Sequence, residues 1–358
     1  MYLWMYAMKI IEEIFEDSLR AAVNETGNIE FGNSDSEFTP VSILRSDPIA
    51  YQAEYRAWLN DVWLAENRMR LQRILAMHGN QKRFNDLCHS VAANNIIPMV
   101  GSGMSKACGL PMWREFLGQL CTYSGVSEQE IDALLDIGSY EEAVDLQAEQ
   151  MGRPLFDERI EHDLRIEDPS MLSGAVRLLP EIFPSLVLTT NLDDVLELTY
   201  EASGRRFTHV LAGQDVERYR QLHAQGRPTL LKLHGDCRRD DGRVLGVAEY
   251  EQAYENGSPC REALSLVYRT RPLLWLGCSL TIDRTVKLVG EVAATDARIP
   301  RHFALLKLPS DNADRINRER DLSRRQIFPI WYDDDHDESI EAILVGILDR
   351  LGRFATGE

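Results

Sequence analysis

The sequence lacks the cysteine pattern of a metal or disulfide protein. Its six cysteines are scattered, at positions 88, 108, 121, 237, 260 and 278, and no two form a Cys-x-x-Cys pair. Such spacing suggests neither a zinc module nor a disulfide framework. We therefore expect a reducing, cytoplasmic environment.

Long apolar runs and excess positive charge are also lacking. No run approaches the roughly 20 apolar residues that span a bilayer, and the apolar first residues lack the basic flank of a signal peptide. The formal net charge is −18 at pH 7, whereas attraction to nucleic acid or to an anionic membrane depends on Lys and Arg. We expect no membrane association and no direct nucleic-acid binding.

What is present is enough apolar material for a large globular fold. Of the 358 residues, 44% are hydrophobic, which is typical of globular proteins. Residues 1–85 show apolar side chains at helical spacing and predict an N-terminal helical extension. Its aromatic residues between Tyr51 and Trp63 suit a core, or a packing surface for another subunit. Residues 86–358 form the second predicted domain.

Six short apolar runs in this second domain predict strands. They are so continuous that they suggest strands buried on both faces of a parallel sheet, and they are Ile96–Val100, Leu186–Thr190, Thr229–Leu233, Leu273–Gly277, Phe303–Leu308 and Phe328–Tyr332. A helical stretch between the first two predicts a small subdomain at about 113–183. The predicted fold class is α/β, a Rossmann-like parallel sheet with a helical insert, an N-terminal helical extension and no zinc module.

Four of the predicted strands end in polar residues at their carboxyl ends. The endings are Gly101–Ser105 (GSGMS), Thr189–Asp194 (TTNLDD), His234–Asp236 (HGD) and Gly277–Asp283 (GCSLTID). The carboxyl ends of an open parallel sheet line the crevice where ligands bind, so we expect these endings to converge on one site. That convergence carries more weight than any one motif.

Each ending has a structural and a functional interpretation. Two glycines one residue apart, between a strand and a helix, let backbone amides approach a phosphate. Lys106 stands where the dinucleotide fingerprint needs a third glycine, so the stretch could also be an ordinary turn. Asn191 could hold a water or a ribose hydroxyl and Asp193 could accept from a carboxamide, or either could cap the next helix. His234 could simply end a strand, but the following glycine permits close backbone approach and favours chemistry.

Taken in order, the motifs GSGMSKACGLPMW, TTNLDD, LKLHGD and LGCSLTID resemble those of the sirtuin family, and more closely its bacterial SIR2-like branch of anti-phage defence. The resemblance covers about residues 90–335. It implies a protein that binds NAD+ in a Rossmann-like crevice and breaks the nicotinamide–ribose bond.

The resemblance also implies roles for individual residues. Asn191 and Asp193 match the Asn-x-Asp that grips nicotinamide and its ribose, and His234 matches the catalytic histidine. Asp283 matches an acid common in the SIR2-like branch, with no assigned role. The residues implied to bind the dinucleotide are Gly101, Ser102, Gly103, Ser105, Thr190, Gly277, Ser279 and Asp283.

The chain departs from deacylating sirtuins in three places. The segment GDCRRDDGRVLGVAEYEQAY after His234 has neither room nor ligands for their four-cysteine zinc module, and Thr190 stands where they have Gln. Deacylating sirtuins have an Asp-Phe-Arg motif near the nicotinamide pocket. This chain has LPMWREF there, in which Arg114 and Phe116 are the only residues that could replace it. These losses weaken the case for an acyl-lysine peptide as second substrate, whereas water needs no docking groove.

The expected function is hydrolysis of NAD+, taken as a substrate, with no zinc and no other metal. One alternative is an NAD-dependent deacylase or ADP-ribosyltransferase, and another is a catalytically silent NAD- or ADP-ribose-binding scaffold. Because an unregulated NAD hydrolase would harm its own cell, we expect gating by assembly, a partner or an infection signal. We expect a homo-oligomer that associates through residues 1–85, and a HerA-type ATPase or another defence protein as partner.

Three further stretches have less specific interpretations. Asp333–Glu338 (DDDHDE) could bind a divalent cation or form a solvated acidic loop. Arg315–Arg325 predicts a solvent-facing helix, with a partner or nucleic-acid contact as the alternative. Tyr250 and Tyr254, four residues apart, are expected to pack along one helical face.

Overall fold

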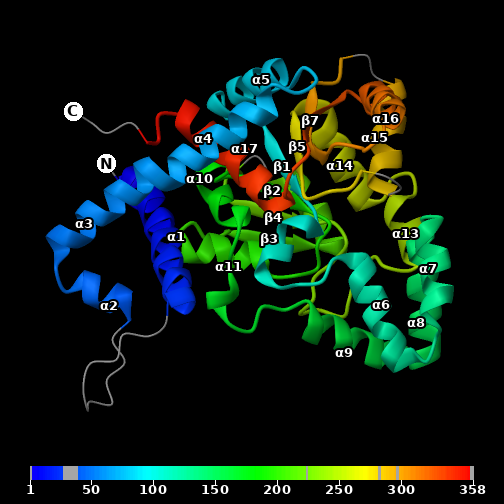
Figure 1. The fold of residues 1–358 in the computed structure, drawn as a ribbon. Helices are drawn as coiled ribbons and strands as arrows, with labels where there is room; N and C mark the ends of the chain where they lie inside the picture. The colour runs from blue at the N-terminus through cyan, green and yellow to red at the C-terminus, as the bar shows by residue number, and fades with distance from the viewer. Residues whose placement is uncertain (1, 27–38, 223–224, 281–283, 296–297, 355–358) are drawn as a thin grey trace, which may run out of the picture.

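The computed structural model describes residues 2–26, 39–222, 225–280, 284–295 and 298–354. Its centre is a seven-stranded sheet in which every pair of neighbouring strands is parallel, with helices on both faces (Figure 1). The strands are β1 (Ile97–Val100), β2 (Leu186–Thr189), β3 (His209–Ala212), β4 (Thr229–Lys232), β5 (Leu273–Leu276), β6 (His302–Lys307) and β7 (Ile327–Tyr332). The predicted α/β class with a Rossmann-like parallel sheet is confirmed.

The order of the strands places a ligand crevice beside β1. The order is β3-β4-β2-β1-β5-β6-β7. The chain runs outward from β1 through β2 to the edge strand β3, places β4 between β2 and β3, and then returns to pair β5 with the other side of β1. The strand order reverses at this point, and ligands bind outside the carboxyl ends of the strands at such a reversal. Each of the six predicted runs matches a strand to within one residue at either end. The seventh, β3, is an edge strand that the sequence did not predict.

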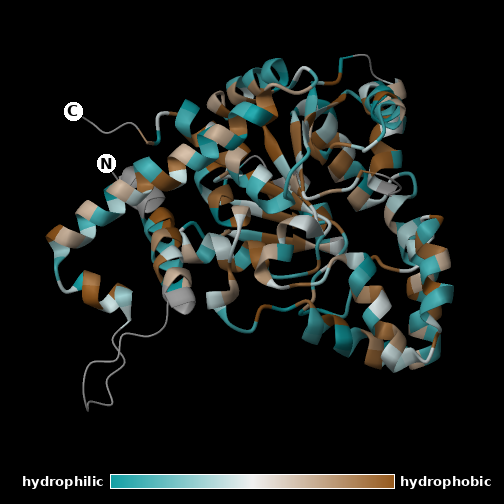
Figure 2. Cartoon of the chain, in the orientation of Figure 1, coloured by the Kyte–Doolittle hydropathy of each residue, from teal (hydrophilic) through white to brown (hydrophobic). Residues whose placement is uncertain are grey.

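Each face of the sheet has its own hydrophobic core, because successive strand side chains point in opposite directions. On β5, Leu274 and Leu276 belong to one core and Leu273 and Trp275 to the other. The first core is covered by α1 (Tyr2–Thr26), α4 (Leu64–Leu75), α5 (Asn80–Ala92), α10 (Leu179–Ile182), α11 (Val195–Ala202) and α17 (His336–Arg350), and the second by α14 (Pro259–Thr270), α15 (Arg284–Thr295) and α16 (Asn312–Arg324). Figure 2 shows the apolar strands at the centre and hydrophilic residues on the outer helices.

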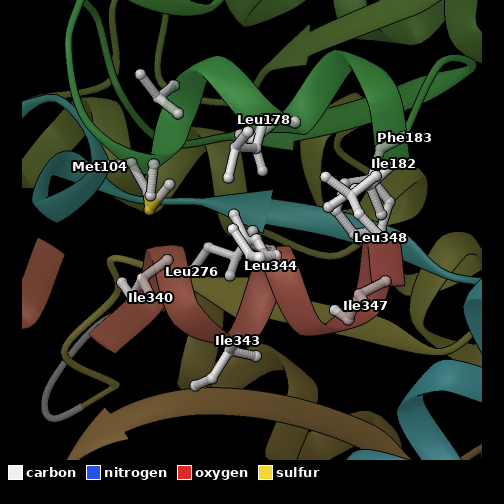
Figure 3. Packing of buried hydrophobic residues seen from close by; sticks show 14 of the residues in the cluster. Met104, Leu178, Ile182, Phe183, Leu276, Ile340, Ile343, Leu344, Ile347 and Leu348 are labelled. Carbon is white, nitrogen blue, oxygen red and sulfur yellow. The ribbon is translucent and has the colours of Figure 1, made fainter. Parts of the chain in front are cut away.

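Helix α17 crosses the first face and fixes its packing. Among its buried residues is an apolar row at positions i, i+3, i+4, i+7 and i+8, the pattern of a helical stripe; the row consists of Ile340, Ile343, Leu344, Ile347 and Leu348. Leu344 lies beside Leu178 of the segment opposite and Leu276 of β5 (Figure 3). Each such side chain contributes about 1.5–3 kcal/mol on burial, so the position of α17, and with it that of His336 at its first residue, is firmly set.

The N-terminal helices pack into the same first core. Phe15 of α1 lies 5.7 Å from Tyr51 and 5.6 Å from Tyr55 between ring centroids. Both tyrosines belong to α3 (Pro48–Ala57), which follows α2 (Pro40–Arg45) and continues through a π-helical turn at Trp58–Trp63 into α4. Trp63 Nε1 donates to Glu341 Oε1 at 2.6 Å and so joins this segment to α17. The aromatic residues therefore form core, while the boundary at residue 85 and a role in self-association stay predictions.

The stretch expected to form a helical insert contains α6 (Trp113–Ser124), α7 (Glu128–Asp136), α8 (Tyr140–Met151) and α9 (Arg153–Asp163), which project from the sheet (Figure 1). A third core of buried residues holds them together; among its members are Phe116, Leu120, Ile131 and Phe156. Leu192 and Leu245, from loops after β2 and β4, belong to the same core. The helical insert thus packs directly against the loops that carry the expected site.

Candidate functional site

Three of the predicted site residues form one buried hydrogen-bonded group, here called the Ser-Asn-Asp group: Ser105, Asn191 and Asp193. Ser105 Oγ donates to Asp193 Oδ2 at 2.8 Å and accepts from Asn191 Nδ2 at 3.2 Å. Their exposed fractions are only 3%, 7% and 8%. The endings of β1 and β2 therefore meet, as expected for neighbouring parallel strands.

The loop after β2 is shaped by its own polar side chains. Thr189 Oγ1 donates to the Val100 carbonyl oxygen at 2.9 Å and accepts from the Asn191 backbone N–H at 2.9 Å. Asp193 Oδ1 accepts from the Val195 N–H at 3.2 Å, at the start of α11. Asp193 therefore supports the next helix, as the structural interpretation expects, and also binds Ser105, while its role toward a carboxamide stays a prediction. Burial raises the pKa of the Asp193 carboxyl, and the nearby Lys232 charge opposes this.

A buried lysine that sequence reasoning missed ties this loop to the next one. Lys232 is fully buried at the end of β4, and its Nζ donates to the carbonyl oxygens of Leu192 (3.1 Å) and Asp193 (2.8 Å). The same Nζ bonds the carboxylates of Glu197 at 2.7 Å and Asp236 at 2.8 Å. Burial works to lower the pKa of the ammonium, but the two carboxylates outweigh it and raise the pKa above its ordinary value. The lysine therefore stays charged.

A close contact between glycines joins the endings of β1 and β5. The Gly101 N–H donates to the Leu276 carbonyl oxygen at 2.8 Å, and the Gly103 N–H donates to that of Gly277 at 3.0 Å. A Cβ atom at Gly101 would lie 2.6 Å from the Gly277 oxygen, and Gly277 itself has a φ of 64°. No larger residue fits this approach, and the N–H groups of both glycines are taken up by the carbonyl oxygens of the β5 ending.

The helix expected directly after the glycine pair is not there. The chain instead makes two 3-10 turns, Ser102–Met104 and Lys106–Cys108, and the next α-helix begins only at Trp113. Gly109, with a φ of 81°, and Pro111 interrupt the helical path between them. A phosphate at this loop would therefore meet turn amides rather than the N-terminus of a long helix.

His234 lies in a turn that brings it against two tyrosines. Gly235 has a φ of 101°, and the Val244 N–H donates to the His234 carbonyl oxygen at 3.0 Å. His234 Nε2 lies 2.8 Å from Tyr254 Oη, and Nδ1 lies 3.2 Å from Tyr250 Oη. Both tyrosines belong to α13 (Val247–Tyr254), and their rings stack at 5.9 Å, which confirms that they share one helical face. Their contact with the histidine was not predicted.

The remaining predicted residues are less enclosed. Ser102, Thr190 and Gly277 are half-buried, while Ser279 is exposed and its carbonyl oxygen accepts from Arg318. Asp283 lies outside the described residues. Arg114 and Phe116, the residues suggested to stand in for the Asp-Phe-Arg of deacylating sirtuins, both have partners within the helical insert. Arg114 pairs with Asp132 and Asp136 of α7, and Phe116 is buried in the third core.

The acidic run Asp333–Glu338 begins a helix. Asp335 Oδ1 accepts from the backbone N–H groups of Asp337 (2.9 Å) and Glu338 (3.1 Å) in the first turn of α17. Among the described residues, no group of three or more His, Cys, Asp or Glu side chains is placed to hold a metal ion. No helix in the described ranges has the length and apolarity needed to cross a membrane.

The fold and these contacts define a class: a doubly wound α/β protein whose strand order reverses beside β1, the position at which such sheets bind ligands. Comparison with protein-family models matches residues 185–330 to the SIR2-like domain. This stretch of the chain is therefore similar to SIR2-like domains, a type of domain that uses NAD+. The matched stretch contains Asn191, Asp193, His234 and Gly277, and β1 pairs with strands of that stretch on both sides.

Proposed function

We propose that the protein is an NAD+ hydrolase, which cleaves the nicotinamide–ribose bond to give nicotinamide and ADP-ribose. The observation that carries this proposal is the buried Ser-Asn-Asp group at the reversal of strand order, with His234 on the adjacent β4 loop. Apolar side chains would fill this position at the carboxyl ends of the strands more favourably, because burying polar groups costs free energy even when they pair with one another, so the polar cluster supports a role in ligand binding.

The contacts support a separate role for each side chain. Asn191 gives its Nδ2 to Ser105, and among the described residues its Oδ1 accepts no hydrogen bond, so Oδ1 is left for water or a ribose hydroxyl. Asp193 uses one lone pair on each oxygen and retains others for the carboxamide N–H groups of nicotinamide. His234 accepts a proton from the ribose hydroxyl or from water. A positioned base of this kind is typically worth roughly 10²–10⁴ in rate.

In the proposed mechanism the bond to nicotinamide breaks first. An oxocarbenium-like ribose forms, and water adds at its anomeric carbon, giving up one proton. Nicotinamide leaves with the bonding electron pair, so the products balance NAD+ plus water. This chain's part is to hold the two halves of NAD+ in the crevice, orient the carboxamide and take up the proton.

The segment after His234 favours water over an acylated peptide as the acceptor. Arg243 is buried, donates to the carbonyl oxygens of Asp236 and Cys237, and pairs with Asp157 of α9 at 2.7 Å. The chain therefore returns directly from His234 to α13, over the stretch where deacylating sirtuins carry their zinc module. Hydrolysis needs no groove for a second substrate.

The proposed biological role is depletion of NAD+ as an effector of anti-phage defence. Such an activity must be held in check, and we propose that assembly through residues 1–85, or a partner such as a HerA-type ATPase, releases it. The net charge of −18 makes a protein partner a better candidate than direct sensing of nucleic acid.

The test is an NAD+ consumption assay on the full-length protein, alone and with the product of a neighbouring gene. Nicotinamide and ADP-ribose are quantified for the wild type, Asn191→Ala and His234→Ala, with the exposed His89→Ala on α5 as the matched control. Each site variant should lose at least about 100-fold in rate and the control should keep its activity. Undiminished turnover in both site variants, shown by thermal unfolding to be folded, would refute the assignment.

A further inference from the structure

Both ring nitrogens of His234 are engaged by tyrosine hydroxyls. Tyr254 Oη lies 2.8 Å from Nε2, and Tyr250 Oη lies 3.2 Å from Nδ1. A neutral imidazole has one nitrogen that donates and one that accepts. His234 therefore cannot accept from a substrate hydroxyl until the tyrosine at its accepting nitrogen moves away.

The two tyrosines differ in how firmly they are held. Tyr254 is 7% exposed and belongs to the core on the second face of the sheet, and its ring packs edge-on against His234 at 5.9 Å. Tyr250 is only partly buried and packs against the margin of that core. Tyr254 is therefore the more deeply buried of the two, and Tyr250 is the one that lies nearer to solvent.

We propose that Tyr254 is a positioning residue that holds His234 in its Nε2–H tautomer, and that Tyr250 occupies Nδ1 until substrate displaces it. In this arrangement Nε2–H donates to Tyr254 Oη, and the Tyr250 hydroxyl donates to Nδ1. A ribose hydroxyl or water then takes the place of Tyr250 as the donor to Nδ1. The inference rests on the proposed role of His234 as proton acceptor.

Helix α13, which carries both tyrosines, is fastened to the helical insert. The Val247 N–H donates to Asp145 Oδ2 of α8 at 3.0 Å. Arg153 of α9 pairs with Glu249 at 2.8 Å, and the same Glu249 accepts from the Gly246 N–H at 3.0 Å. The first turn of α13 must therefore move with the helical insert, which connects the departure of Tyr250 to any partner that shifts the insert.

The first experiment reads the tautomer of His234 directly and does not depend on turnover. Ring-nitrogen NMR of the ¹⁵N-histidine-labelled protein should show the Nε2–H tautomer in the wild type and in Tyr250→Phe, and a mixture of tautomers in Tyr254→Phe. Added ADP-ribose should change the Nδ1 signal of the wild type more than that of Tyr250→Phe, where no hydroxyl has to leave. A wild type in the Nδ1–H tautomer would overturn the proposal.

The second experiment compares the two variants kinetically. Tyr254→Phe should lower kcat by roughly 10-fold or more, leave KM nearly unchanged and alter the pH profile. Tyr250→Phe should keep kcat within a few-fold and lower KM. Tyr123→Phe, a tyrosine of the helical insert whose ring lies under Arg159, is the control. A loss of kcat in Tyr250→Phe as large as in His234→Ala, or an unchanged kcat and pH profile in Tyr254→Phe, would contradict the proposal.

The two experiments separate this inference from the proposed function. If the wild type cleaves no NAD+ under any condition, the proposed function fails, while the tautomer still decides whether the tyrosines orient the ring. If NAD+ is cleaved but the tautomer and kinetics do not respond to either variant, only this inference fails.

Discussion

The ammonium of Lys232 lies 2.8 Å from the backbone carbonyl oxygen of Asp193 and 2.8 Å from the carboxylate of Asp236. One buried cation therefore spans the two loops that carry the Ser-Asn-Asp group and His234. Its charge is balanced by Glu197 and Asp236, both of which lie within 2.8 Å. Lys232 joins the two loops together with the hydrogen bond from the Cys237 N–H to the Leu192 carbonyl oxygen and the ion pair between Arg238 and Asp194.

Replacing Lys232 with Met should strongly destabilise the protein. The substitution keeps the length of the side chain but leaves the Glu197 and Asp236 carboxylates without their partner, and breaking a buried ion pair from one side typically costs about 3–5 kcal/mol. Urea unfolding measures the effect, and Lys307→Met, at an exposed position on β6, is the matched control.

A compensated variant checks the reason for that loss. Adding Glu197→Gln and Asp236→Asn to Lys232→Met removes the uncompensated charges, so part of the stability should return. A single variant as stable as the wild type would show that the lysine does not hold the loops together.

Ser105→Ala should reduce NAD+ cleavage without unfolding the protein. The serine hydroxyl donates to Asp193 and accepts from Asn191, so its loss frees both side chains at once. Hydrogen bonds to charged groups are worth about 1.5–3 kcal/mol, which corresponds to a loss of roughly 10- to 100-fold in kcat/KM. Ser323→Ala on α16 is the control, and equal activity of the two variants would count against the Ser-Asn-Asp group.

Gly277→Ala and Gly118→Ala should have opposite effects on stability. At Gly277, alanine needs a left-handed backbone, which costs about 1–2 kcal/mol, and its Cβ would lie 2.5 Å from the Met104 nitrogen. Gly118 lies inside α6 with no atom within 4 Å of an added Cβ, so alanine there should stabilise by about 0.5–1 kcal/mol. Thermal unfolding compares them, and equal melting temperatures would refute the close contact between the glycines.

His302 should make the stability depend on pH. It is fully buried on β6 against the Tyr268 ring, and burial lowers its pKa from the ordinary 6.5 to about 3. Below pH 6.5 the unfolded chain binds a proton that the folded chain does not, so stability falls by up to about 1.4 kcal/mol per pH unit between 6.5 and 3. Above pH 6.5 this contribution is fully present.

His302→Asn should remove that part of the pH dependence. The His302 Nδ1 accepts from the Leu273 N–H at 3.0 Å, and an asparagine oxygen is able to take over this bond. Unfolding free energies measured between pH 5 and 7 should have a smaller slope in the variant. Identical slopes would mean that His302 does not enter the fold uncharged.

Most of the sheet was predictable because a strand buried on both faces leaves a continuous apolar run in the sequence. The strand β3 left no such run, since it lies at the edge of the sheet and Val210 is 40% exposed. The two 3-10 turns after Gly101 were missed for another reason. A pair of glycines before an apolar stretch fits a helix as well as a turn. Only Gly109 and Pro111 indicate that the α-helix cannot begin before them.

The site was predictable as far as strand ends determine it. Parallel pairing of β1 with β2 places the loop that carries Ser105 at the same edge of the sheet as the loop that carries Asn191 and Asp193. The contacts of Lys232 were not predicted, because the residue stands inside the apolar run Thr229–Leu233. A charged side chain in a strand buried on both faces does, however, imply that carboxylates lie nearby. Tyr250 and Tyr254 were predicted to share a helical face. That this face lies against His234 depends on the turn at Gly235, and the sequence pattern does not indicate the direction of that turn.

The central claim is that this site cleaves NAD+ with water as the acceptor. The most direct measurement is the product balance of the full-length protein, with and without its neighbouring gene product, in the presence and absence of an acetyl-lysine peptide. The account predicts one nicotinamide and one ADP-ribose for each NAD+ consumed, unaffected by the peptide. It would be contradicted by turnover that requires the peptide, or by NAD+ that binds in calorimetry yet remains intact under every condition.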